Sequence, residues 1–293
     1  MRIVSFLPAA TEMAFALGLD DAIVGVSHEC DFPAAARSRP VVVHNAVSLA
    51  ALSPSEIDST VARTLRETGS LYAVDEGLLR SLAPDLILTQ DLCQVCAPSG
   101  NEITRLLGSL DPRPDVLYLT PRSLADVDDN LLMIGDAVER RDVAERIVAD
   151  GRERLDKVAR LTSQVSRRPT VFFAEWTDPL YCAGHWVPEM IERAGGVPLV
   201  ARAGSDSVRV SRDEAIAANA DVVIVAPCGY SLEGAVEQAS LVGVPAKRTF
   251  AVDANSYFAR PGPRLIDGVE LIAHLLHPDL CDWRGHDSAY RAL

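Results

Sequence analysis

Residues 252–265 read Val252-Asp-Ala-Asn-Ser-Tyr-Phe-Ala-Arg-Pro-Gly-Pro-Arg-Leu265, and their counterpart at the other end reads Met1-Arg-Ile-Val-Ser-Phe-Leu-Pro-Ala-Ala-Thr-Glu-Met-Ala-Phe-Ala-Leu-Gly18. The opening segment predicts a short apolar strand, a turn at Pro8 and then a helix, because its apolar run gives way to helix-forming residues after the proline. The closing segment leads from a strand into an aromatic pair, Arg260 and a Pro-Gly-Pro turn. Both ends of the chain therefore favour β–α structure.

Short runs rich in Val and Ile alternate with helical patterns along the rest of the chain, which is typical of βα units and mainly parallel sheets. Strands are predicted over 3–7, 22–27, 41–43, 86–89, 116–119, 170–175, 198–200, 222–226 and 249–252. Helices are predicted over 10–17, 54–67, 76–82, 101–107, 188–194, 212–217, 232–238 and 264–276. The pattern indicates an α/β fold.

The middle of the chain has a different pattern of apolar residues. They recur at spacings of three and four: Leu124, Val127, Leu131, Ile134 and Val138. This spacing is the stripe of an amphipathic helix. Ser123, with Asp126 three residues on, resembles a capping box. We expect one long helix over 123–166 between a lobe at 1–122 and a lobe at 167–293. Two helices broken near Arg141 are the alternative.

The two end segments resemble those of the substrate-binding proteins that capture cobalamin, haem and ferric siderophores for ABC importers. In that family the opening segment reads strand, Ser-x-Pro-Ala-x-Thr-Glu, helix, Leu-Gly, and the closing segment carries an aromatic followed by Arg-Pro-Gly-Pro-Arg. The resemblance covers nearly the whole chain. It implies two Rossmann-like lobes joined by a single long backbone helix, with the ligand in the cleft between the lobes.

Candidate ligand-binding residues follow the predicted strands or lie in nearby loops, where open α/β sheets bind ligands. They are His28, Glu175, Trp176, Trp186, Tyr230, Tyr257 and Arg260. A large flat ligand such as a corrin offers faces against which aromatic side chains pack. The resemblance implies that Trp186 contacts the corrin, that Arg260 reaches the ligand and that Glu192 docks on a transporter. Both Trp186 and Arg260 are expected to be at least partly exposed without ligand, and Ser256 stands where cobalamin binders carry Asp.

Four of the six cysteines fall just after predicted strands: Cys30, Cys93, Cys96 and Cys228. Thiolates, together with an imidazole such as that of His28, suit zinc or an iron–sulfur cluster. A single Cys-x-x-Cys is weaker evidence than a paired motif, and free cysteines are often simply buried. The sequence therefore leaves two roles open for these cysteines, a metal site and ordinary packing in the core.

The composition and net charge of the chain limit the kinds of molecule that it could bind. Hydrophobic residues at 48% and charged residues at 24% are typical of a folded globular protein. The net charge of −13 disfavours nucleic acid, which requires clustered Lys and Arg. No stretch approaches the roughly 20 apolar residues of a membrane span. The run 3–7 is also shorter than the apolar core of about 7–15 residues in a secretory signal, so we expect a cytoplasmic protein, or a periplasmic one if a leader was removed.

These observations favour a two-lobed protein that binds cobalamin, a related corrinoid or another metal chelate without transforming it. In the cytoplasm it would be a carrier or scavenger that hands its ligand to a transporter or a corrinoid-handling enzyme. Two alternatives stand beside this interpretation. One is a metalloprotein or metal-dependent enzyme with zinc or an iron–sulfur cluster on the cysteines, and the other is an ABC-importer component whose leader was removed.

Overall fold

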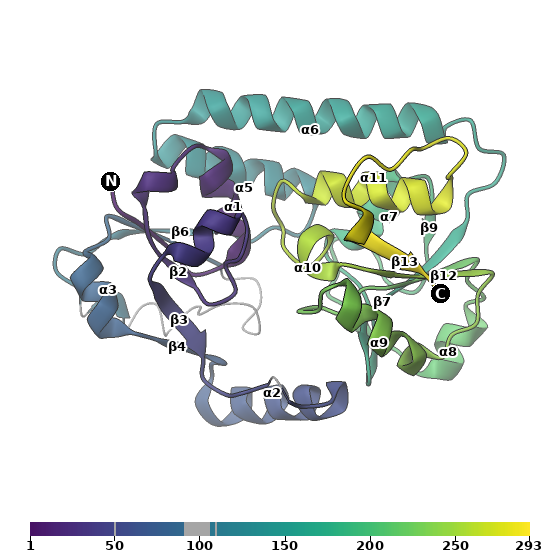
Figure 1. Cartoon of the computed structure of the whole chain (residues 1–293), viewed down its shortest axis with the longest axis horizontal. Helices are drawn as coiled ribbons and strands as arrows, with labels where there is room; N and C mark the ends of the chain where they lie inside the picture. The colour runs from purple at the N-terminus through teal and green to yellow at the C-terminus, as the bar shows by residue number, and fades with distance from the viewer. Residues whose placement is uncertain (50, 91–105, 109) are drawn as a thin grey trace. The chain divides into compact units, whose positions relative to one another are not determined.

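The computed structural model describes residues 1–49, 51–90, 106–108 and 110–293. The chain divides into two compact units (Figure 1). Unit 1 comprises Met1–Thr120 and Asp128–Glu145, and unit 2 comprises Pro121–Val127 and Arg146–Leu293. The predicted α/β class and its two-lobed organisation are confirmed. The lobe boundaries expected near 122 and 166 stay a prediction.

Unit 1 is built on a sheet with the strand order β4-β3-β2-β1-β5-β6. Its strands are β1 (Ile3–Ser5), β2 (Ile23–Ser27), β3 (Val41–Asn45), β4 (Tyr72–Val74), β5 (Leu86–Thr89) and β6 (Asp115–Tyr118). All neighbours are parallel except β4, which runs antiparallel to β3. The parallel pairs agree with the βα pattern of the sequence.

The helices of unit 1 that the structure describes over their full length include α1 (Pro8–Ala16), α2 (Pro54–Thr68) and α3 (Glu76–Leu82). Pro8 starts α1 without loss, because the first helical N–H groups have no partner within the helix. A capping box between Ser53 and Glu56 starts α2, and Gly69 ends it at φ 78°. The helix predicted over 101–107 lies mostly outside the described residues.

Unit 2 is built on a sheet with the strand order β10-β8-β7-β11-β12-β13, and β9 pairs with β7. The strands are β7 (Thr170–Thr177), β8 (Leu180–Cys182), β9 (Val197–Pro198), β10 (Val208–Arg209), β11 (Val222–Val225), β12 (Arg248–Val252) and β13 (Tyr290–Ala292). Strands β7, β11 and β12 are parallel neighbours, so their carboxyl ends meet at one edge.

Five α-helices of the described residues lie wholly within unit 2: α7 (Val187–Arg193), α8 (Arg212–Ala217), α9 (Leu232–Val242), α10 (Ala254–Tyr257) and α11 (Leu265–Leu276). Figure 1 shows α7 and α11 on one face of the sheet and α8 and α9 on the other. The core between strands and helices includes Phe172, Val223 and Val225, each at most 1% exposed. The sheet is therefore covered on both faces, as a mainly parallel sheet requires.

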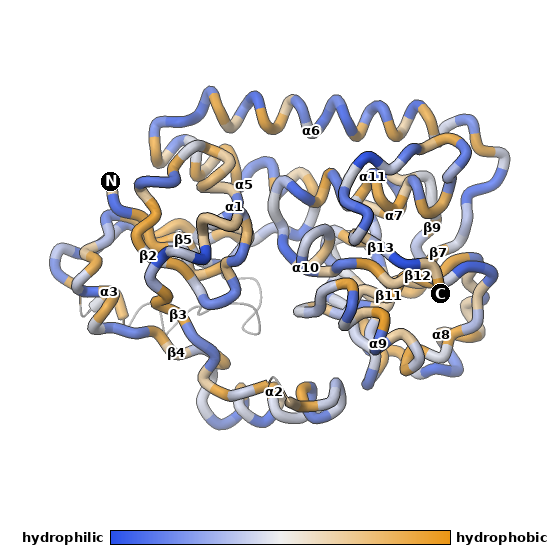
Figure 2. Tube along the Cα trace, viewed as in Figure 1, coloured by the Kyte–Doolittle hydropathy of each residue, from blue (hydrophilic) through white to orange (hydrophobic). Residues whose placement is uncertain are grey.

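The prediction of one continuous helix over 123–166 is wrong. The segment forms two helices, α5 (Leu124–Ala137) and α6 (Arg141–Thr162), and each has residues in both units. Glu139 lies between them in the left-handed region at φ 56°, which ends a right-handed helix. In Figure 2, hydrophilic and hydrophobic residues alternate along α6, as in an amphipathic helix.

The turn between α5 and α6 brings small residues of the two helices close together. A Cβ atom at Gly135 would lie 2.8 Å from the Ala144 Cβ atom, so the two helices meet where their side chains are smallest. The Arg141 guanidinium bridges the turn, donating to Asp136 Oδ2 at 2.6 Å and to Glu145 Oε1 at 2.9 Å. Among the described residues, no helix combines the length and the apolar character needed to cross a bilayer.

Candidate functional site

The strongest candidate site lies at the carboxyl edge of the parallel strands of unit 2. Glu175 and Trp176 end β7, Tyr230 follows β11, and Tyr257 follows β12. The backbone N–H of Cys228 donates to the Glu175 carbonyl oxygen at 3.0 Å, which joins the loop after β11 to the end of β7. The structure therefore brings several of the predicted ligand-binding residues to one edge.

Glu175 occupies a β-bulge. Ala174 pairs with Cys182 and Trp176 pairs with Tyr181, so β7 has one more residue than β8 between these pairs. A bulge of this kind redirects the extra side chain out of the regular alternation of the strand. The local geometry thus singles out Glu175 from its neighbours on β7.

Hydrogen bonds hold the Glu175 carboxylate. The Ser207 hydroxyl donates to Oε2 at 2.7 Å, and the Gly184 N–H donates to the Ser207 hydroxyl at 3.2 Å. Burial raises the pKa of Glu175, whereas the hydrogen bonds from Ser207 and Gly184 act in the opposite direction. Neighbouring Cys182 is buried, and its thiol pKa is raised by burial, with a contribution from the Glu175 charge.

The loop that carries Ser207 is fixed against His185. The His185 N–H donates to the Ser205 carbonyl at 2.6 Å, and the Gly204 N–H donates to the His185 carbonyl at 2.8 Å. A Cβ atom at Gly184 would lie 2.5 Å from the Ser205 carbonyl oxygen, so only glycine permits this approach. Burial lowers the pKa of His185, and the charge of Asp206 opposes that change.

Trp176 and Tyr230 form an aromatic pair at the same edge. Their ring centroids lie 5.9 Å apart in an edge-to-face arrangement. The indole N–H of Trp176 donates to the Asp178 carbonyl at 3.1 Å, and both side chains are only partly buried. Burial raises the pKa of the Tyr230 hydroxyl. The pair presents partly exposed aromatic surface next to Glu175.

Trp186 is buried, at 8% exposure, and this corrects the expectation that it would be at least partly exposed. Its indole N–H donates to the Phe258 carbonyl at 2.8 Å, and the Phe258 ring meets that of Phe173 edge to face at 5.2 Å. The physical reason is that an indole buries a large apolar area once its N–H has a partner. Trp186 therefore anchors the segment that follows β12.

That segment carries the remaining predicted residues of unit 2. Tyr257 is partly buried, and its ring meets Trp283 edge to face at 5.7 Å. Burial raises the pKa of Tyr257, and the charges of Asp253 and Asp267 raise it further. The Ser256 hydroxyl donates to Asp253 Oδ2 at 2.7 Å, so Ser256 stabilises the start of α10. Arg260 is partly buried just beyond α10.

Glu192 lies in the last turn of α7 and is exposed. Its backbone carbonyl accepts from Arg168 Nη2 at 2.8 Å and from the Gly195 N–H at 3.1 Å. These bonds fix the end of α7 while the carboxylate points into solvent-accessible space. Glu192 stays a predicted partner-docking residue.

His28 belongs to unit 1, at the end of β2 and the start of the following loop. Its Nδ1 atom lies 3.1 Å from the Val43 carbonyl oxygen and its Nε2 atom 3.8 Å from Glu29 Oε1. Its ring is tilted against that of Tyr72 at 6.3 Å between centroids. His28 is thus held between two neighbouring strands and remains a predicted ligand-binding residue.

The predicted cysteine ligands are only partly described. Cys30 is buried in unit 1, where its Sγ atom accepts from the Thr11 hydroxyl at 3.1 Å. Cys228 is exposed in unit 2, and Cys93 and Cys96 lie outside the described residues. Within the described parts of the chain, no group of three or more His, Cys, Asp or Glu side chains is arranged to hold a metal ion. The zinc or iron–sulfur site stays a prediction.

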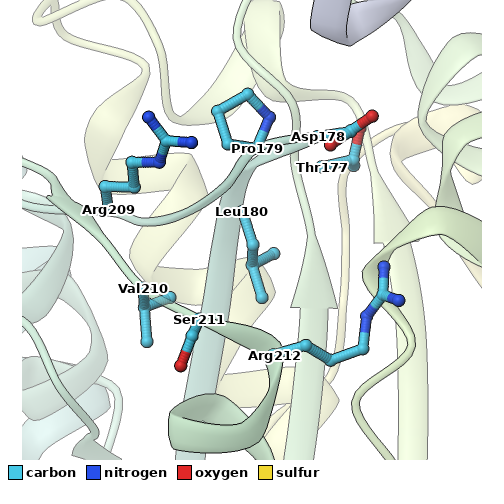
Figure 3. A pocket seen from close by; sticks show the side chains of 8 residues that line it. All are labelled: Thr177, Asp178, Pro179, Leu180, Arg209, Val210, Ser211 and Arg212. Atoms are coloured by element: carbon cyan, nitrogen blue, oxygen red, sulfur yellow. The ribbon is translucent and has the colours of Figure 1, made fainter.

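A pocket of about 350 Å³ lies beside the β7–β8 turn of unit 2 (Figure 3). Its lining residues are Thr177, Asp178, Pro179, Leu180, Arg209, Val210, Ser211 and Arg212. Arg212 donates through Nη2 to the Leu241 carbonyl at 2.8 Å and through Nε to the Val242 carbonyl at 3.3 Å. Its guanidinium thus caps the end of α9, and the residues predicted to bind ligand lie elsewhere.

Comparison with known proteins identifies the family. A vitamin B12-binding protein of Vibrio cholerae is 26% identical over 287 residues, which is 94% of this chain and 88% of that protein. An uncharacterised ABC transporter substrate-binding lipoprotein, YvrC of Bacillus subtilis, is 25% identical over 95% of this chain and 80% of its own length.

Solved structures share the fold. A periplasmic haem-binding protein from Pseudomonas aeruginosa superimposes with a TM-score of 0.71 at 20% identity, covering 95% of this chain and 93% of that one. The family described as periplasmic binding protein matches residues 3–251. The chain, with its two α/β units, belongs to the periplasmic binding protein family.

Proposed function

We propose that this chain is a substrate-binding protein that captures cobalamin or a related corrinoid and does not transform it. One observation carries the proposal: the relative named as a vitamin B12-binding protein is similar over 94% of this chain and 88% of its own length. Similarity at 26% identity that runs from end to end supports a shared ligand class more than a match to one domain would.

The edge of unit 2 supports the same ligand class. A corrin is a large, flat metal chelate with apolar faces, and the partly exposed rings of Trp176, Tyr230 and Tyr257 suit such faces. Arg260 and Glu175 add polar groups that would orient the ligand. Trp186 offers only the 8% of its surface that remains exposed. His28 of unit 1 stays a predicted ligand-binding residue.

Delivery requires a partner, and the similarity to an ABC transporter substrate-binding lipoprotein favours an importer. We propose that exposed Glu192 docks on it, since a carboxylate at the surface pairs readily with basic residues of a partner. A carrier that serves a corrinoid-handling enzyme in the cytoplasm is the alternative. Binding of the purified chain to transporter-containing vesicles would favour the importer.

Equilibrium titration with cyanocobalamin tests the proposal. The tryptophan fluorescence should be quenched to saturation near one ligand per chain, because the corrin would lie against Trp176. Arg260→Ala should weaken binding by about 1–3 kcal/mol, the usual effect of truncating an anchor. Arg160→Ala, which removes an exposed arginine of α6, is the matched control and should bind like the parent. Saturable binding of haem, with none of any corrinoid, would contradict the proposal.

A further inference from the structure

We infer that Glu175 selects the ligand, favouring corrinoids whose periphery carries amides over chelates whose periphery carries carboxylates. The inference rests on the proposed function, since it assumes that a chelate binds at the carboxyl edge of unit 2. It goes beyond that function by assigning the chemical group that the site recognises. The observations that carry it are the bulge at Glu175, the bonds that orient its side chain and the adjoining aromatic pair.

The bulge gives Glu175 a position that a regular strand would not. It lies between the Ala174–Cys182 and Trp176–Tyr181 pairs as the extra residue of β7. Bulges recur next to functional sites, where they redirect one side chain. The next residue along β7 is Trp176, whose ring packs edge to face with that of Tyr230 at 5.9 Å. A chelate resting on these rings would therefore bring its edge substituents close to Glu175.

The orientation of the carboxylate follows from the bonds of Ser207. A serine hydroxyl has one proton. Because this hydroxyl accepts from the Gly184 N–H at 3.2 Å, its proton is free to point to Glu175 Oε2, which lies 2.7 Å away. The carboxylate is thus held before any ligand arrives. A carboxylate has about four acceptor sites, so it retains capacity for further donors.

Recognition then depends on what the ligand offers. An amide substituent has N–H groups that donate to a carboxylate, and such charge-assisted hydrogen bonds are among the stronger ones. A carboxylate substituent offers no proton at neutral pH and would place a second negative charge beside the first. Two carboxylates side by side in a partly buried site either repel each other or must take up a proton, and both outcomes cost free energy at neutral pH, even though burial already raises the pKa of Glu175. Glu175 therefore favours amides by attraction and disfavours carboxylates by repulsion.

Two corrinoid probes test the inference: dicyanocobinamide, whose corrin carries amides, and dicyanocobyrinic acid, whose corrin carries carboxylates in their place. The parent should bind the amide probe at least about tenfold more tightly, given the cost of like charges at an interface. Glu175→Gln keeps the shape but removes the charge, so this preference should shrink to within about threefold, mainly through tighter binding of the acid.

Two further variants sharpen the test. Glu237→Gln removes an exposed charge from α9 of the same unit and should leave the tenfold preference intact. Ser207→Ala leaves Glu175 charged but less firmly held, and should give an intermediate preference. If both probes bind and Glu175→Gln keeps the parent's preference, the inference is wrong while the proposed function stands. If neither probe binds the parent, the proposed function fails and the inference falls with it.

Discussion

Trp186, a proposed ligand contact, is buried in unit 2, so we expect it to stabilise the fold as well. The side chain is 8% exposed, and its indole N–H donates to the Phe258 carbonyl at 2.8 Å. Trp186→Ala should lower the free energy of unfolding by about 3–5 kcal/mol, the usual cost of deleting a buried aromatic ring. Urea denaturation followed by far-UV circular dichroism measures the change.

Trp186→Phe separates packing from hydrogen bonding at this position. The phenyl ring keeps most of the apolar contact but leaves the Phe258 carbonyl without its donor. Its cost should therefore be about 1–3 kcal/mol, the penalty for an unsatisfied buried acceptor. A Trp186→Ala variant as stable as the parent would show that the ring is dispensable to the fold. Loss of corrinoid affinity in that variant must be assessed against this loss of stability.

The residues of the site were predicted unevenly, and the reason is physical. The sequence indicates that Trp176, Tyr230 and Tyr257 lie at or beyond the ends of strands, because the apolar runs of those strands are clear, while their role in binding stays a prediction. Ser207 was not predicted, because its role depends on the Ser205 carbonyl lying against Gly184, a contact without any periodic signal. The burial of Trp186 likewise depends on Phe258, which is distant in the sequence.

Gly135 in α5 and Gly151 in α6 differ in the space around them, so the same substitution to alanine can be compared at the two positions. A Cβ atom at Gly135 would lie 2.8 Å from Ala144 Cβ and 3.2 Å from the Arg140 carbonyl oxygen. Gly135→Ala should therefore destabilise the protein by about 1–2 kcal/mol, as overpacking exceeds the gain in helix propensity.

Gly151 is the counterpart in α6, where a Cβ atom would meet Ile266 Cγ1 at an ordinary 3.4 Å. Gly151→Ala should leave stability unchanged or raise it by up to about 1 kcal/mol, since alanine is the better helix former. Thermal or urea unfolding of the two variants compares them directly. Equal effects of the same sign would mean that the α5–α6 approach does not limit side-chain size.

Asp221 joins the amino ends of two strands of unit 2. Its Oδ2 atom accepts from the Thr170 N–H at 3.0 Å and from Arg167 Nη2 at 2.8 Å, and its Oδ1 atom accepts from Lys247 Nζ at 2.8 Å. The ammonium group of Lys247, the Thr170 N–H and hydroxyl and the charge of Arg167 lower the pKa of Asp221 well below its usual range. The Asp221 side chain is 11% exposed, whereas those of Arg167 and Lys247 are 69% and 72% exposed, so solvent screens the two ion pairs more than it screens the bonds from Thr170.

A lowered pKa means that this stabilisation is present at neutral pH and is lost as the pH falls below about 5 toward the folded-state pKa. Asp221→Asn should therefore cost about 1.5–3 kcal/mol at pH 7, the value of hydrogen bonds to a charged group. The difference from the parent should shrink between about pH 5 and pH 3. Asp156→Asn, at an exposed site on α6, is the control, and a deficit of Asp221→Asn that is independent of pH would contradict the assignment.

The sequence predicts the fully buried four-residue strands β5 and β11 closely. β5 spans the predicted range 86–89, and β11 ends one residue before its predicted limit. β8, β10 and β13 were not predicted, because each has at most three residues, too few for an alternating pattern to appear. The sequence alone does not decide between one helix and a break near Arg141, since the apolar spacing continues up to Val138 and the Gly135–Ala144 approach is a tertiary contact.

For the whole molecule, the connecting helices link the stability of the two units. Helix α5 contributes Leu124–Val127 to unit 2 and its remainder to unit 1, and α6 contributes Arg141–Glu145 to unit 1 and its remainder to unit 2. Helix formation is cooperative, so unfolding one part of a helix removes hydrogen bonds on which the next turn depends. The two units should therefore unfold together rather than in separate steps.

The tryptophans make this testable, because all three (Trp176, Trp186 and Trp283) lie in unit 2. Their fluorescence reports unit 2 alone, whereas far-UV circular dichroism reports both units. Gly135→Ala, a change in unit 1, should lower the urea midpoint by the same amount with both probes, because coincident transitions mark a single cooperative step. If the circular dichroism midpoint falls while the fluorescence midpoint stays at the parent value, the units unfold independently and continuity through α5 and α6 does not couple them.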